Sequence, residues 1–176
     1  MIFAGAGLPG VYVIEIEKLA DERGFFARTW CKHEFRDHGI EVGWVQCNVS
    51  GNRRRGTLRG MHYQAAPSQE AKLVRCTRGA VHDVIIDLRP DAHTYLEHAS
   101  AVLTAENGRM LYIPEGLAHG FLTLEDDTEV FYMMSEFYAP HLARGVRWND
   151  PVFDIQWPAD VAVVSDRDQN YADFVP

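Results

Sequence analysis

Two histidines placed beside glycines are the residues of this chain best suited to chemistry. His62 lies in the segment RGMHYQ at residues 59–64, and His119 lies in PEGLAHGF at residues 114–121. An imidazole can exchange a proton near neutral pH, and a glycine lets a ligand or a second backbone approach a strand closely. Because both segments are strand-like, they predict a small β-barrel whose interior is lined with bases and hydrogen-bond donors.

The side chains around His62 can be assigned to faces of its strand. Successive side chains alternate, so His62 and Gln64 share one face, with Met61 and Tyr63 on the other. Arg59 is out of phase, but a twist or bulge at the neighbouring glycine would turn it toward the same cavity. A lone histidine on a strand is more often a satisfied or exposed residue, and the density of polar side chains nearby favours the pocket.

Further polar residues interrupt apolar strands. Gln46 and Asn48 alternate on one face, Lys72 opens a strand, and Tyr132 sits inside the run VFYM. A buried lysine without a partner is costly. If Lys72 faces inward, we expect it to meet an anionic ligand; the alternative is that it is exposed at the start of its strand.

The elements that must position these residues are mostly strands. Apolar residues follow a period of two or form short runs, separated by turn residues, which is typical of an antiparallel sandwich or barrel. A short helix is predicted near residues 32–38, ended by Gly39, and another is predicted to begin near Pro140. The predicted strands cover residues 11–16, 44–49, 72–76, 81–88, 109–113 and 128–134.

Charge and length limit the classes of partner. The 176 residues suit one domain, and the net charge of −8 disfavours nucleic acid, because phosphates would be repelled. The run of Arg53, Arg54 and Arg55 between glycines predicts a solvated hairpin tip, with phosphate binding by one of the arginines as the alternative.

The remaining composition indicates a cytoplasmic protein. The three cysteines, Cys31, Cys47 and Cys76, have neither zinc spacing nor an even number for a disulfide framework, so reduced structural thiols are expected. The first residues lack the basic and apolar regions of a signal peptide, and no window approaches the roughly 20 apolar residues of a membrane span. We therefore expect no membrane partner.

The chain contains eight segments that match one protein family in order and spacing, from about residue 10 to residue 170. Through these segments together, which are more specific than any single motif, the chain resembles the dTDP-4-dehydrorhamnose 3,5-epimerases. The segments are RGFF at 23–26, QCN at 46–48, RGMHYQ at 59–64, KLVR at 72–75, DVIIDLR at 83–89, PEGLAHGF at 114–121, WNDP at 148–151 and SDRD at 165–168.

This resemblance implies an all-β, cupin-like antiparallel jelly-roll barrel with short peripheral helices, formed by residues 1–176 as one domain. It also implies a homodimer in which strands and N-terminal residues are exchanged, a nucleoside diphosphate 4-keto-6-deoxy sugar as substrate, and no cofactor. The ketone at carbon 4 acidifies the hydrogens on carbons 3 and 5. A base can remove one, and the resulting enolate can be reprotonated from the opposite face of the ring.

The family's catalytic roles fall on four residues of this chain. By resemblance, His62 is the base, Asp168 orients its imidazole, Tyr132 donates the proton on the opposite face, and Lys72 assists the phenol and stabilises the enolate oxygen. Read without the resemblance, Asp168 would be part of a solvated turn and Tyr132 a core aromatic. The implied substrate-binding residues are Arg23, Phe26, Gln46, Asn48, Arg59, His119, Tyr138, which stacks on the base, and Arg167.

Two positions depart from the family pattern. Where the family usually has glutamates, this chain has Arg28 and Ala143. Both positions are associated with substrate recognition in the family. Inversion at both carbons is the leading expectation, and inversion at carbon 3 only, on a different nucleotide or a different 4-keto sugar, is the alternative.

Two other classes of function fit parts of this pattern. A metal-dependent cupin would use His62, the residue at position 64, Glu70 and His119, but position 64 is Gln64, which is a poor ligand for a transition metal. A noncatalytic sugar-nucleotide binding module would keep the pocket, but it would have no need of a base, its orienting carboxylate and an acid.

Overall fold

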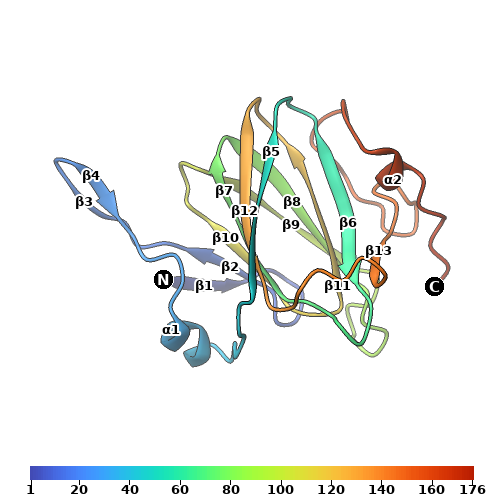
Figure 1. The fold of residues 1–176 in the computed structure, drawn as a ribbon, viewed down its shortest axis with the longest axis horizontal. Helices are drawn as coiled ribbons and strands as arrows, with labels where there is room; N and C mark the ends of the chain where they lie inside the picture. Colours follow the sequence, from blue (N-terminus) through green and yellow to red (C-terminus); the bar gives the residue numbers. More distant parts are fainter.

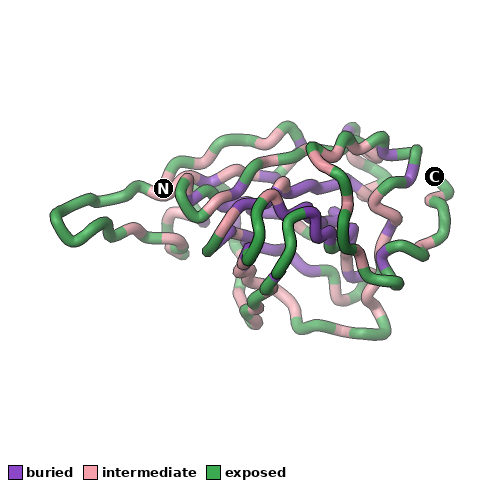
Figure 2. Tube along the Cα trace, turned by 90° about the horizontal axis from the view of Figure 1, so that it is seen from above, coloured by how far each residue is buried: buried purple, intermediate pink, exposed green.

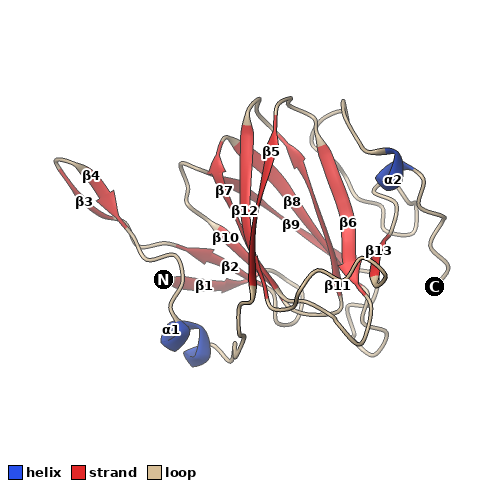
Figure 3. Cartoon of the chain, viewed as in Figure 1, coloured by secondary structure: helices blue, strands red, loops and turns tan.

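Two antiparallel sheets, packed face to face, make up the body of the protein (Figures 1 and 3). The computed structural model describes residues 1–176. The six-stranded sheet has the order β1 (Ile2–Gly5), β2 (Tyr12–Glu15), β10 (Met110–Ile113), β7 (Lys72–Arg78), β12 (Thr128–Met134) and β5 (Gln46–Asn52). The five-stranded sheet has the order β13 (Ala143–Gly145), β6 (Leu58–Gln64), β11 (Leu117–Thr123), β8 (Ala80–Asp87) and β9 (His98–Thr104). This arrangement confirms the expected jelly roll.

The largest apolar cluster joins the inner faces of the two sheets. Val74 and Val130 contribute from one sheet, and Ile85 and Phe121 contribute from the other; all four are buried. Burying such side chains stabilises a fold by about 1.5–3 kcal/mol each. The cluster therefore fixes the spacing between the sheets, and the functional residues lie in the part of this interior that is not filled.

The predicted strands are all present, with ends shifted by a few residues. The helix predicted near residues 32–38 is also confirmed as α1 (Lys32–Asp37), and Gly39 follows it with φ of 77°, a conformation that glycine adopts readily. The helix predicted near Pro140 is wrong, because a turn there leads into β13, which pairs with β6. The second helix is instead α2 (Asp166–Gln169).

The loop that carries three arginines differs in part from its prediction. Arg53, Arg54 and Arg55 are exposed, as expected, but they connect β5 of one sheet with β6 of the other, so the hairpin was wrong. The three cysteines are free thiols, as predicted. Neither helix has the length and apolar character that crossing a membrane requires.

A two-stranded hairpin projects away from the body near the N-terminal end (Figures 1 and 2). It consists of β3 (Leu19–Asp21) and β4 (Gly24–Phe26), and every residue of both strands is exposed. Leu19 and Phe26 leave 69% and 71% of their surface open to solvent. Large apolar side chains at this exposure, gathered on one hairpin, are typical of a surface that another chain covers.

Candidate active site

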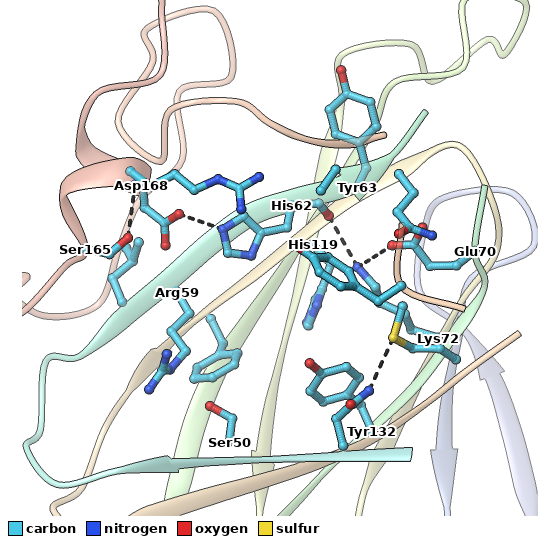
Figure 4. Close-up of a pocket in the computed structure, with 18 of the residues that line it drawn as sticks. Ser50, Arg59, His62, Tyr63, Glu70, Lys72, His119, Tyr132, Ser165 and Asp168 are labelled. Atoms are coloured by element: carbon cyan, nitrogen blue, oxygen red, sulfur yellow. Dashed lines mark hydrogen bonds and ion pairs between the residues drawn. The ribbon is translucent and has the colours of Figure 1, made fainter. Parts of the chain in front are cut away.

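A cavity of about 780 Å³ opens between the two sheets. Its walls include residues of β5, β7 and β12 from one sheet and of β6 and β11 from the other, together with the loop before α2 (Figure 4). Of the predicted site residues, ten line it: Gln46, Asn48, Arg59, His62, Lys72, His119, Tyr132, Tyr138, Arg167 and Asp168. Most of the predicted site residues therefore share one continuous pocket.

His62 and Asp168 form a hydrogen-bonded pair on the five-stranded side of this cavity. The Nε2 atom of His62 lies 2.6 Å from Oδ1 of Asp168, so Nδ1 is the ring nitrogen left to face the cavity. Asp168 is itself held, because its second oxygen accepts the Gly60 amide and its own amide donates to Ser165, which caps α2. The imidazole therefore has a fixed tautomer and orientation, as a general base requires.

The ionisation of Asp168 follows from these contacts. Burial raises the pKa of its carboxyl, but hydrogen bonds from His62, Gly60 and Ser165 and the charge on His62 outweigh burial, and the net pKa is lowered. The group is therefore a carboxylate at neutral pH. A carboxylate at this position supports the positive charge that His62 acquires when it takes up a proton.

The bulge predicted at Gly60 is present. Between β6 and β11, His62 pairs with His119 and Arg59 pairs with Phe121, so three steps on one strand match two on the other. Gly60 has φ of 134°, and a Cβ atom there would lie 2.5 Å from the Gly120 Cα, so only glycine fits. The bulge turns Arg59 into the cavity, where Asn52 accepts a hydrogen bond from its Nε at 2.7 Å.

Tyr132 comes from the opposite sheet. It lies on β12 between Asn48 of β5 and Val74 of β7, and it lines the same cavity as His62. Burial raises the pKa of the Tyr132 phenol, and the charge of Arg59 opposes that rise. The phenol therefore holds its proton at neutral pH, which is the state a proton donor needs.

Lys72 differs from its prediction in one respect. It faces inward and is buried, but its partner is a protein carboxylate: Glu70 Oε1 lies 3.0 Å from the Lys72 Nζ atom. The same ammonium donates to the His62 carbonyl oxygen at 3.4 Å. The alternative of an exposed lysine is therefore wrong, and the anionic ligand stays a prediction, since Glu70 already offsets the burial of Lys72. Arg59 is the cation whose charge opposes the rise in the pKa of Tyr132.

A second histidine–aspartate pair joins His119 of the cavity wall to Asp83 of β8. His119 Nε2 is 2.9 Å from a carboxylate oxygen of Asp83, and both side chains are buried. The Gln46 amide donates to the Asn48 side chain at 3.0 Å. The side chain of Gln64 instead bonds the backbone of Ser68, Phe137 and Ala139, and it so holds the loop that carries Tyr138.

Arg23 and Phe26 are the predicted site residues that the cavity does not contain. Both belong to the exposed hairpin, where Arg23 forms an ion pair with Asp21 and leaves 84% of its side chain open to solvent. Within one chain they do not reach the pocket. The cavity of a single chain is therefore formed without the hairpin.

The structure also shows partners that the sequence prediction missed. Glu70 stands two residues before Lys72, and this spacing was a usable signal for a same-face pair. Asp83, inside an apolar strand, was another. Tyr171, which packs beside His62, had no local signal. The four positions of the metal alternative form no ligand set, since no group of three or more His, Cys, Asp or Glu side chains converges.

A jelly roll that holds an oriented histidine on one sheet and a half-buried tyrosine on the other, facing one cavity, is the framework of a cupin-type enzyme. Comparison with known proteins narrows this class. Residues 6–175 match the family described as dTDP-4-dehydrorhamnose 3,5-epimerase, and the chain belongs to this family. It is 42% identical to the dTDP-4-dehydrorhamnose 3,5-epimerase of Methanothermobacter thermautotrophicus, over 96% of this chain and 92% of that protein.

Solved structures agree with this assignment. A crystal structure of dTDP-4-dehydrorhamnose 3,5-epimerase from Bacillus anthracis with TDP and PPi bound has a TM-score of 0.95 and 35% identity, covering 98% of this chain and 99% of that one. A 3'-monoepimerase from Streptomyces bikiniensis in complex with dTDP-quinovose has a TM-score of 0.89 and 34% identity, covering 95% of this chain and 85% of that one. The fold and family expected from the motifs are confirmed.

Proposed function

We propose that this protein epimerises a nucleoside diphosphate 4-keto-6-deoxy sugar at carbons 3 and 5, as a dTDP-4-dehydrorhamnose 3,5-epimerase does. His62 removes the proton next to the ketone through Nδ1, and Tyr132 returns a proton to the other face. The observation that carries the proposal is that these two groups enter one cavity from opposite sheets. A sugar ring held between the sheets has the base on one side and the acid on the other.

Lys72 stabilises the enolate oxygen that forms between the two proton transfers. Two of its N–H bonds point to Glu70 and to the His62 carbonyl, which leaves the third for the ligand. A positioned donor at a developing oxyanion lowers a barrier by about 3–4 kcal/mol. The chemistry then rests on side chains of the cavity alone.

The diphosphate and the base occupy the outer part of the cavity in this proposal. Arg59 and Arg167 are the cations that meet the phosphates, and Tyr138 stacks on the base. The pKa of Arg167 is raised by its contact with Tyr138, so its charge is secure. These cations matter because the chain carries a net charge of −8, which would otherwise repel a nucleotide.

The protein acts as a homodimer in this proposal, and the hairpin of one protomer completes the pocket of the other. Arg23 and Phe26, which lie outside the cavity of their own chain, then reach the partner's nucleotide. The exposure of Leu19 and Phe26 supports the proposal, because association would cover this apolar surface.

Proton exchange in deuterated water tests the catalytic roles. His62→Ala should abolish deuterium uptake into a 4-keto-6-deoxy sugar nucleotide, because it removes the imidazole that Asp168 orients toward the cavity. Tyr132→Phe should retain some exchange but lose completed inversion, because the deprotonation step survives. Proton NMR of the sugar measures both. Uptake by His62→Ala equal to that of the wild type would refute the proposal.

Inversion at carbon 3 only is the second candidate. It is favoured by Ala143, which lines the cavity where the family usually has a glutamate, and by the similarity to the 3'-monoepimerase. The same NMR experiment separates the two, because label at carbon 5 appears only if both positions react. Titration with thymidine, cytidine, uridine and guanosine diphosphates then tests whether Arg28 and Ala143 alter nucleotide preference.

A further inference from the structure

Tyr171 occupies a place beside His62 that the fold leaves open. In the sheet, the neighbours of His62 are His119 on β11 and Gly145 on β13. Cross-strand partners point their side chains to the same face. Because residue 145 is a glycine, one flank of the imidazole has no neighbour from the sheet itself.

The ring of Tyr171 fills that flank. A Cβ atom built on Gly145 would overlap the ring, lying 2.6 Å from the phenolic oxygen and closer still to two ring carbons. The ring centroid is 6.5 Å from that of His62, with the planes at 70°, which is an edge-to-face contact. The tyrosine thus stands where a side chain of residue 145 would otherwise meet the catalytic histidine.

Tyr171 is held from both directions along the chain. On its N-terminal side, Asp168 is bonded to His62 and to the Gly60 amide, and Arg167 lies 5.9 Å above the Tyr171 ring. On its C-terminal side, Asp173 forms an ion pair with Arg147, and the Phe174 amide donates to Asp150 at 2.7 Å. These contacts fix the backbone on both sides of Tyr171 and so hold its ring over Gly145.

The hydroxyl of Tyr171 is buried, and the group that acts on it is the Arg167 guanidinium, not His62. Burial raises the pKa of this phenol, and the nearby Arg167 opposes the rise, so the group stays neutral. The contact with His62 is made by the aromatic ring.

We infer that Tyr171 is a positioning residue for the catalytic base, fixing the His62 imidazole by the ring that it seats on Gly145. Asp168 fixes one nitrogen of the imidazole, and the Tyr171 ring restricts its rotation and keeps water from its open flank. This inference rests on the proposed role of His62 as the base. Tyr171 touches the histidine and not the sugar, so it acts on turnover and not on binding.

Four variants test the inference through the kcat and KM of epimerisation. Tyr171→Ala should lower kcat about tenfold with KM within twofold, because a misaligned base loses rate and not affinity. Tyr171→Phe should restore kcat to the wild-type value. Gly145→Ala should reproduce the loss by displacing the ring, and Gly145→Ala combined with Tyr171→Ala should be no worse than Tyr171→Ala alone. Val175→Ala, in the same tail and 85% exposed, is the matched control.

A substrate-free measurement separates failure of the inference from failure of the proposed function. The NMR signal of the His62 Nε2 proton, bonded to Asp168, should be sharp in the wild type and in Tyr171→Phe but broadened by exchange in Tyr171→Ala. An unchanged signal and unchanged kcat in Tyr171→Ala would overturn the inference while leaving the base in place. Equal losses in Tyr171→Phe and Tyr171→Ala would overturn it in favour of a role for the hydroxyl.

Discussion

Asp168 is ionised at neutral pH in spite of its burial, because three donors compensate the loss of water. The pKa of its carboxyl is lower in the folded chain than the unfolded value near 4. A lowered pKa means that the group stabilises the fold fully above about pH 4 and loses this contribution as the pH falls through the folded value. The stability of the fold therefore depends on the ionisation of the carboxylate that is bonded to His62.

Asp168→Asn should show this dependence. At pH 7 the substitution should lower the free energy of unfolding by about 1–3 kcal/mol, because a buried charge-assisted hydrogen bond is lost. The difference between the two proteins should shrink as the pH falls below about 4, where the wild-type carboxyl takes up a proton. Urea unfolding at a series of pH values measures it. A difference that stays constant down to about pH 2.5 would contradict this account.

The pair of Lys72 and Glu70 shows that a neighbouring side chain can change the interpretation of a buried charge. The lysine alone suggested an anionic ligand, and the structure gives it a carboxylate 3.0 Å away. The second oxygen of Glu70 is buried without a partner. A buried pair of this kind is costly in desolvation and contributes geometry more than stability. In our proposal, the ion pair with Glu70 orients one N–H bond of Lys72 toward the cavity.

Among the elements, strand β6 carries two of the predicted site residues, Arg59 and His62. One bulge lets Arg59 and His62, three residues apart, face the same cavity. Regular alternation would send one of them outward. Gly60 makes the bulge possible, because its φ of 134° and its contact with Gly120 exclude a side chain.

Gly60→Ala should therefore be strongly destabilising. The unfavourable backbone conformation and the overlap with Gly120 should together cost about 2–4 kcal/mol. Gly5→Ala on β1 is the matched control, since it meets nothing within 4 Å and should change stability little. Thermal and urea unfolding report both variants. Similar stability of the two proteins would show that the bulge tolerates a side chain.

The elements also show where sequence reasoning succeeds and fails. The bulge at Gly60 could be predicted, because glycine beside an out-of-phase arginine is a local signal. The helix near Pro140 could not be corrected locally, because Ala143 to Gly145 form a strand only by pairing with β6, some eighty residues earlier. Tyr171 was missed for the same reason: its neighbour is Gly145, and only the tertiary structure brings the two together.

At the scale of the whole molecule, the site is distributed over both sheets and, in our proposal, over two chains. The motifs identified His62, Tyr132 and Asp168 as one set without any coordinates. The expectation that N-terminal residues are exchanged came from the resemblance alone, because sequence order does not show whether Arg23 and Phe26 reach the cavity of their own chain.

Mixing two inactive variants tests the sharing of sites. Arg23→Ala and His62→Ala should each impair turnover alone. If hairpins cross between protomers, dimers of one of each contain one intact site, and random exchange should restore about a quarter of wild-type activity. The assay is epimerisation after unfolding and refolding the mixture, with each variant refolded alone as control. Activity no greater than the sum of the separate variants would exclude crossing.

The helix that supplies Asp168 follows every strand of both sheets in the sequence, since β13 ends at Gly145 and α2 begins at Asp166. During synthesis on the ribosome, all strands can emerge and pair before the carboxylate that orients His62 is available. A nascent barrel would then be folded but catalytically silent. Competence would arrive only when α2 is in place, so turnover would report the docking of this helix as well as the pairing of the strands.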